Sequence, residues 1–220
     1  MSVLQPTSAG FYENAITNTS PTSGGGEGYA PYLHQIHNVL KLQPQSVLVI
    51  GQGDNIVPSI LRGLVMHDIE VDTFDFVEDM KPTYVGDVRQ LDKIVERRYD
   101  VILCCEVLEH LPFAEFAGCL QKISMLNRKG VVLSLPIFGI SGYIKVGISG
   151  FKHFTIPVSI RYFKPGWKVM CKQHHWEIND RNGTKKRDVI RVIEEHFTIR
   201  NHYRAKDVPY HMFFELENKA

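Results

Sequence analysis

The sequence predicts an α/β fold built on a doubly wound, mostly parallel sheet with helices on both faces. The apolar run Ser46–Ile50 indicates a short strand that is buried on both sides, as central parallel strands are. Gly51 and Gly53 follow it directly and precede a helical pattern, and a strand, a glycine turn and a helix form the ligand crevice of such sheets. Near the C-terminus, a helical pattern followed by two strand patterns predicts a closing antiparallel hairpin.

The expected elements alternate along the chain in the order that this fold requires. Residues 1–28 are rich in Ser, Thr and Gly, which favours a flexible arm, with an N-terminal lid over the ligand as the alternative. Residues 29–220 then form the main domain, whose first helix has Pro31 in its first turn. Further helices are expected over 56–66, 91–98, 113–126 and 185–196. Strands are expected over 46–50, 69–76, 81–88, 99–105, 129–135, 197–203 and 210–216.

Composition narrows the class of protein. A length of 220 residues suits one α/β domain with an insertion, and a net charge of +1 gives no global argument for a nucleic acid or an anionic surface. The four cysteines show no C-x-x-C pairing, so neither a zinc site nor a disulfide framework is indicated. Reduced thiols, no secretion signal pattern and no apolar run of membrane-spanning length lead us to expect a cytoplasmic protein.

The residues around the glycine turn favour a ligand without phosphates. A dinucleotide site needs a third small residue where this chain has Ile56, which is too large for the close helix–strand contact. Asp54 places a carboxylate at the helix end that would receive a pyrophosphate, and the two negative charges would repel. Asp75, at the end of the second strand, lies at about the distance along the chain at which an acidic residue meets ribose hydroxyls. An NAD-dependent oxidoreductase is therefore disfavoured.

Together with Y-V-G-D-V (84–88) and Y-D-V-I-L-C-C-E-V-L-E-H-L-P (99–112), these segments resemble the class I S-adenosylmethionine-dependent methyltransferases. The resemblance covers roughly residues 29–136 in order, and the E-V-L-E-H-L-P run is typical of the branch that acts on small molecules. H-H-W-E-I (174–178) and Y-H-M-F-F-E-L (210–216) are similar to a group of bacterial and archaeal methyltransferases. The resemblance implies a Rossmann-like sheet of seven strands and S-adenosylmethionine as cofactor.

The same resemblance implies a set of cofactor contacts. Gly51, Gln52 and Gly53 would line the methionine end, and Asp75 would bind the ribose. Asp87 and Val88 would face the adenine, and Glu106 would lie beneath the sulfonium. The complete implied set is Gly51, Gln52, Gly53, Asp54, Asp75, Phe76, Asp87, Val88 and Glu106.

Two positions depart from the family's first motif. The third position of the first strand usually carries Asp or Glu and here is Val49, and a usual third glycine is Asn55. The missing carboxylate normally helps to hold the methionine amino group, a task that Glu106 or Asp54 would have to take over. These departures keep open a second hypothesis, a catalytically weak or inactive cofactor-binding module with the same fold.

The segment from 136 to 173 is long for a strand-to-helix connection and is expected to form a basic, aromatic cap. No Asp or Glu occurs between Phe116 and Trp176. Three interpretations remain open: a solvated surface, a pocket for an anionic acceptor, and contact with an anionic membrane. The pocket is favoured over the membrane, with Tyr143, Lys145 and Lys152 as candidate substrate-binding residues.

Methyl transfer to a hydroxyl or an amine needs an aligned acceptor and a base. His110 is the first candidate base because it follows the fourth strand at the ligand-binding edge, with a structural, helix-capping histidine as the alternative. His175 is the second candidate, oriented by Glu177, and a purely structural loop is the alternative there. The histidines at 153, 174, 175 and 211 show no fixed metal-site spacing, so we predict no metal.

Nucleic-acid methylation is disfavoured by the residues after the fourth strand. Base-amino methyltransferases carry Asn or Asp, Pro-Pro and an aromatic residue there, whereas this strand ends C-C-E-V. Cytosine-C5 enzymes use a Cys that usually follows Pro, but Cys105 follows Cys104. We therefore expect a methyl group to move from S-adenosylmethionine to an oxygen or nitrogen of a small acceptor, and the basic segment leaves an anionic acceptor as one of its open interpretations.

Overall fold

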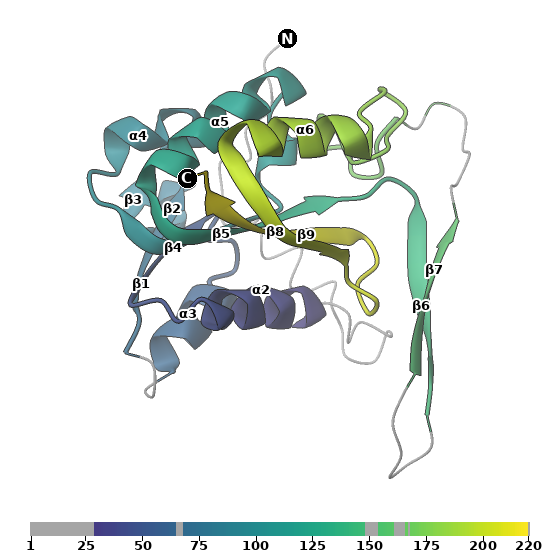
Figure 1. The fold of residues 1–220 in the computed structure, drawn as a ribbon, viewed down its shortest axis with the longest axis horizontal. Helices are drawn as coiled ribbons and strands as arrows, with labels where there is room; N and C mark the ends of the chain where they lie inside the picture. Colours follow the sequence, from purple (N-terminus) through teal and green to yellow (C-terminus); the bar gives the residue numbers. More distant parts are fainter. Residues whose placement is uncertain (1–28, 65–67, 148–153, 161–165, 167, 220) are drawn as a thin grey trace.

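The computed structural model describes residues 29–64, 68–147, 154–160, 166 and 168–219, and the expected arm over 1–28 lies outside them. Its main body is a seven-stranded sheet in the order β3-β2-β1-β4-β5-β9-β8 (Figure 1). The strands are β1 Ser46–Ile50, β2 Glu70–Asp75, β3 Tyr84–Val85, β4 Tyr99–Cys105, β5 Asn127–Pro136, β8 Phe197–Arg204 and β9 His211–Asn218. The first five are parallel, and β9 is antiparallel to both β5 and β8. The predicted doubly wound sheet with a closing hairpin is confirmed.

Helices cover both faces of the sheet. One face carries α2 Ala30–Lys41 and α3 Ile56–Gly63, and the other carries α4 Leu91–Ile94, α5 Phe113–Leu126 and α6 Lys186–His196 (Figure 1). Short 3₁₀ turns span Glu78–Met80 (η2), Val88–Gln90 (η3) and Leu108–His110 (η4). The helix expected over 91–98 is shorter than predicted, because Val95 turns to an extended conformation and buries its side chain in the core. No helix in the described part of the chain is long and apolar enough to cross a lipid bilayer.

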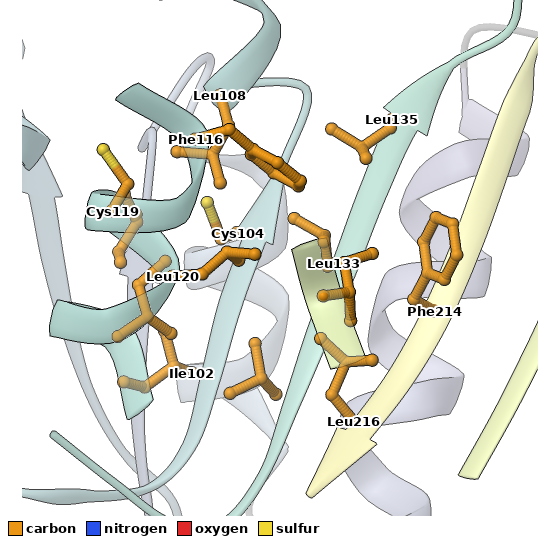
Figure 2. Packing of buried hydrophobic residues seen from close by; sticks show 14 of the residues in the cluster. Ile102, Cys104, Leu108, Phe116, Cys119, Leu120, Leu133, Leu135, Phe214 and Leu216 are labelled. Carbon is orange, nitrogen blue, oxygen red and sulfur yellow. The ribbon is translucent and has the colours of Figure 1, made fainter. Parts of the chain in front are cut away.

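Alternate residues of the central strands enter two separate cores. Val101 and Leu103 of β4 pack towards α2 and α3, whereas Ile102 and Cys104 pack towards α5. Figure 2 shows the second core, in which β4, β5 and β9 contribute side chains opposite Phe116, Cys119 and Leu120 of α5. Because both faces of β4 are covered, its sequence is apolar nearly throughout.

The segment predicted as a cap contains an antiparallel two-stranded ribbon, β6 Ile140–Val146 and β7 Phe154–Ile160. In Figure 1 the ribbon extends from the end of β5 and stands apart from the body of the sheet. Its register pairs apolar residues at every second position, including Ile144 with Ile156 and Val146 with Phe154. We call the following residues the apolar ribbon face: Ile140, Ile144, Val146, Phe154, Ile156, Val158 and Ile160. All seven are exposed, from 38% at Val158 to 71% at Phe154.

Substitution of two glycines tests how the seven-stranded sheet and its helices pack. Gly118 lies inside α5 with open space where a Cβ would be, so Gly118→Ala should stabilise the protein by about 0.5–1 kcal/mol through helix propensity. Gly130 lies in β5, where a Cβ would meet Leu42 Cδ1 at 2.8 Å and the Leu216 carbonyl oxygen at 3.1 Å. Gly130→Ala should therefore destabilise by roughly 1–3 kcal/mol. Urea unfolding of both variants measures the difference, and equal stabilities would contradict the packing of β9 on β5.

Candidate functional site

The turn after β1 has a backbone that requires glycine or a residue that tolerates positive φ. Gly51 has φ +78°, and a Cβ there would lie 2.3 Å from Cγ2 of Val107. Gly53 has φ 58°, and Asn55 also adopts the left-handed conformation, with φ 61°. Asn is among the few residues that tolerate this conformation. The departure from glycine at Asn55 is thus compatible with the same backbone turn.

Asp54 has a structural role in this turn. Its Oδ1 accepts a hydrogen bond from the Ile56 amide at 3.1 Å and so caps the start of α3, although Asn55 occupies the capping position. Its Oδ2 accepts a hydrogen bond from the Tyr32 hydroxyl at 2.5 Å, which ties α2 to the turn. Both carboxylate oxygens therefore have partners within the protein, and the cofactor contact expected of Asp54 stays a prediction.

Asp75 is the last residue of β2 and is buried, with 3% of its surface exposed. Its Oδ1 accepts a hydrogen bond from the Val77 amide at 2.9 Å, whereas Oδ2 has no hydrogen-bond partner among the described residues. Burial raises the pKa of Asp75, and the amides of Val77, Gln52 and Gly53 partly offset this. The carboxylate thus lies at the glycine turn with one oxygen left to accept a hydroxyl.

The other expected cofactor contacts lie around the same edge of the sheet. Gln52 donates from Nε2 to the Met80 carbonyl at 2.8 Å, which joins the glycine turn to η2. Phe76, directly after Asp75, is 46% exposed. Asp87 follows β3, and the guanidinium of Arg89 lowers its pKa. The next residue, Val88, is buried.

Glu106 follows β4 and adopts a positive φ of 54°. Its Oε1 accepts a hydrogen bond from Ser134 Oγ at 3.0 Å and lies 3.0 Å from Nδ1 of His211. Burial opposes ionisation, but the charge and contact of His211 outweigh it and the pKa of Glu106 is lowered. Because the next residue, Val107, fills the space beside Gly51, Glu106 adjoins the glycine turn. No local sequence pattern marks Ser134 or pairs His211 with Glu106, because these two residues come from β5 and β9, far from Glu106 in the chain.

A second polar cluster lies beside Glu106, and it corrects one predicted pair. Nδ1 of His174, not His175, lies 2.8 Å from Glu177 Oε1. The same oxygen accepts hydrogen bonds from the amides of Met170 and Cys171 and from the Tyr210 hydroxyl. Burial lowers the pKa of His174, but the contacts with Cys171 and Glu177 outweigh it and raise the pKa to about 10.

The predicted bases His110 and His175 lie in different surroundings. His110 ends η4; its Nδ1 is 3.3 Å from the Gln173 carbonyl, and its ring packs edge-on against His174. His175 is exposed and lines a surface pocket of about 430 Å³ together with Trp176 and Arg191. None of the residues at the glycine turn lines that pocket.

The two sequence motifs at 106–112 and 174–178 pack against each other. The His175 amide donates to the Glu109 carbonyl at 2.8 Å, and Trp176 Nε1 donates to the Leu111 carbonyl at 3.1 Å. The Trp176 ring also packs edge-on against Phe113 and Phe116 of α5. The end of the insertion is thus fixed to the segment that follows β4.

Two of the three candidate substrate residues belong to the ribbon. Tyr143 and Lys145 belong to β6, where they pair with Pro157 and Thr155. Lys152 lies outside the described residues, as does the side chain of Lys145. Their role in binding the acceptor stays a prediction.

Comparison with known proteins identifies the fold. No family model and no curated protein matches the sequence. Magnesium protoporphyrin IX methyltransferase from Synechocystis PCC 6803, solved with S-adenosylhomocysteine, is 15% identical over 97% of this chain and 96% of that one, with a TM-score of 0.61. Burkholderia thailandensis 1,6-didemethyltoxoflavin-N1-methyltransferase is 15% identical over 100% and 93%, with a TM-score of 0.57. A Clostridium acetobutylicum S-adenosylmethionine-dependent methyltransferase is 10% identical over 96% and 98%, also with a TM-score of 0.57. The chain has the fold of these enzymes.

Proposed function

We propose that this protein is an S-adenosylmethionine-dependent methyltransferase that acts on an oxygen or nitrogen of a small acceptor. The observation that carries the proposal is the buried Asp75 carboxylate, which lies at the glycine turn with Oδ2 unpaired. An unpaired buried carboxylate oxygen is costly unless a ligand supplies a donor. The fold shared with methyltransferases that bind S-adenosylhomocysteine supports the identity of that ligand.

The residues at the sheet edge fit a nucleoside without phosphates. Asp75 would accept hydrogen bonds from the ribose, and Gly51, Gln52 and Gly53 would hold the methionine end along uncovered backbone. Exposed Phe76, with Asp87 and Val88 beyond it, would contact the adenine. When bound, S-adenosylmethionine supplies an electrophilic methyl group on a sulfonium. Glu106, held ionised by His211 and Ser134, would place negative charge beneath that cation.

His211 is the best-placed group to accept a proton from the acceptor. Nδ1 of His211 lies 3.0 Å from Glu106 Oε1 without making a hydrogen bond, so the carboxylate would stabilise the imidazolium that forms when a neutral His211 takes up the proton on Nε2. His110 and His175 stay the sequence-based alternatives. His110 packs against His174, and His175 lines the separate surface pocket. The basic insertion, with Tyr143, Lys145 and Lys152, favours an anionic acceptor.

Calorimetry with S-adenosylmethionine, S-adenosylhomocysteine and NAD distinguishes the proposed methyltransferase from two alternatives, an oxidoreductase and a cofactor-binding module without catalysis. Binding of the first two alone supports the proposal, and binding of NAD would favour an oxidoreductase. Binding without turnover on phosphorylated, nucleotide-linked and carboxylated metabolites would favour a module without catalysis. Val49 motivates that module, because it is a buried core residue where the family usually has a carboxylate.

The ribose contact gives a first prediction. Asp75→Asn keeps the size of the side chain but removes its charge and one acceptor, so affinity for S-adenosylhomocysteine should fall by roughly 1–3 kcal/mol. Asp92→Asn, an exposed residue on α4, is the control and should bind as the unmodified protein does. Titration calorimetry measures both. An unchanged affinity in Asp75→Asn would remove this residue from the site.

The base gives a second prediction. With an acceptor found by the metabolite screen, His211→Asn should lower kcat by about 10²–10⁴-fold, the usual range for loss of a general base. Affinity for S-adenosylhomocysteine should be retained. His202→Asn on β8, an exposed position, is the matched control. Unchanged kcat in His211→Asn would return the assignment to His110 or His175.

A further inference from the structure

Glu109 is a fully buried carboxylate without a hydrogen bond. Its exposed fraction is 0%, and neither Oε1 nor Oε2 has a hydrogen-bond partner among the described residues. The nearest cationic atom is Nε2 of His174 at 3.9 Å from Oε1, which is too long for a hydrogen bond. Burial and the neighbouring Glu106 carboxylate raise the pKa of Glu109, so its burial is compensated either by a proton or by a cation that takes the place of that proton.

Two imidazoles lie close to the Glu109 carboxylate. Nδ1 of His174 is engaged by the Glu177 carboxylate at 2.8 Å, and Nδ1 of His110 contacts the Gln173 carbonyl at 3.3 Å. In both rings Nε2 is the nitrogen that would bind a metal ion, and in His174 such binding would displace the proton from Nε2. Metal-binding histidines are held in this way, with the second nitrogen bonded to a carboxylate or a backbone carbonyl.

The three side chains also converge. Glu109, His110 and His174 each offer one ligand atom, and these atoms lie within 4.8 Å of one another. We propose that these residues form a binding site for a divalent transition-metal ion of the zinc type. Ligand atoms at bond lengths of about 2.0–2.2 Å from a tetrahedral ion are about 3.4 Å apart, so a contraction of at most about 1.4 Å between any two of them closes the site.

The donor set specifies the class of metal. Two imidazole nitrogens and one carboxylate oxygen suit zinc, iron or manganese better than magnesium or calcium, which prefer oxygen alone. Three protein ligands leave at least one coordination position open. The sequence predicted no metal because Glu109 and His110 are adjacent while His174 comes from the far end of the insertion, so no ligand spacing is visible. The inference concerns metal binding alone and does not depend on methyl transfer.

The test uses the full chain after dialysis against EDTA and then against buffer without chelator. Titration with Zn²⁺ and, separately, Mn²⁺ should show one ion per chain for at least one of them, together with a rise in melting temperature. Glu109→Gln and His110→Asn should each lower the affinity at least tenfold. His37→Asn, exposed on α2, is the control and should bind normally.

Three results would overturn the metal site. One is the absence of binding by either ion, and another is equal affinity in Glu109→Gln, His110→Asn and the control. The third is loss of binding in Cys171→Ser, because Cys171 interacts with His174 and would indicate a thiolate site instead. Retained binding in Cys171→Ser supports the proposed ligands.

A different observation carries a second inference, on the apolar ribbon face. Seven large apolar side chains are exposed along one ribbon, and contiguous apolar surface of this kind marks an interaction site. Between Ile137 and Gln173 the sequence holds six Lys or Arg residues and no Asp or Glu. This charge attracts an anionic surface and repels a second copy of the same segment.

We further infer that the apolar ribbon face lies on an anionic lipid membrane. Apolar side chains would enter the boundary between headgroups and acyl chains, and the net positive charge of the insertion would draw it to the anionic surface over a longer range. The sequence alone favoured a pocket over a membrane, because it did not reveal that the apolar residues share one uncovered face.

Vesicle sedimentation tests this inference with the full chain. The protein should bind phosphatidylcholine vesicles containing phosphatidylglycerol, and should bind pure phosphatidylcholine at least tenfold more weakly. The double variant Ile144→Thr/Ile156→Thr keeps β-branched residues at a cross-strand pair and should lose binding at least tenfold. Thr155→Ser is the control. Failure to bind anionic vesicles would overturn the inference. Light scattering that shows a dimer, lost in the double variant but not in the control, would also overturn it, because the apolar ribbon face would then be a dimer interface.

Discussion

The close approach of Gly51 to Val107 is the constraint on which the rest of the site depends. With no Cβ at Gly51, the turn after β1 packs directly on the segment after β4, and a methyl group there would meet Val107 Cγ2 at 2.3 Å. Parallel pairing of Ile50 with Cys104 brings the two strand ends level. Asp75 from β2 and Glu106 from β4 therefore reach one edge of the sheet, although neither is close to the other in sequence.

Local patterns predicted most of the helices and strands, and they suggested candidate site residues at the ends of the strands. β1, β4 and α5 begin and end where the apolar periodicity changes, because each is long enough or buried enough to show its period. Asp75 was recognisable as a candidate ribose contact because it ends a strand at the ligand-binding edge of the sheet. The positive φ of Asn55 is also consistent with its residue type, because Asn replaces Gly at positive φ with little strain.

Contacts between distant segments could not be predicted in this way. Glu177 contacts His174 and not His175, because Trp176 and Glu177 are both buried whereas His175 faces solvent. Likewise, the sequence shows alternating apolar residues over 140–160, but alternation is typical of a half-buried strand. Only the three-dimensional arrangement shows that this face has no cover among the described residues.

Both ends of the insertion are hydrogen-bonded to each other. The Phe138 amide donates to the Ile178 carbonyl at 2.9 Å, and the Ile178 amide donates to the Pro136 carbonyl at 2.9 Å. The intervening chain is thus a loop closed at its base by backbone bonds of the body itself. Lengthening or shortening such a loop changes its closure entropy only slowly with the number of residues. The length and sequence of the ribbon can therefore change during evolution, together with the surface that the ribbon contacts, while the ends of the sheet strands keep their geometry.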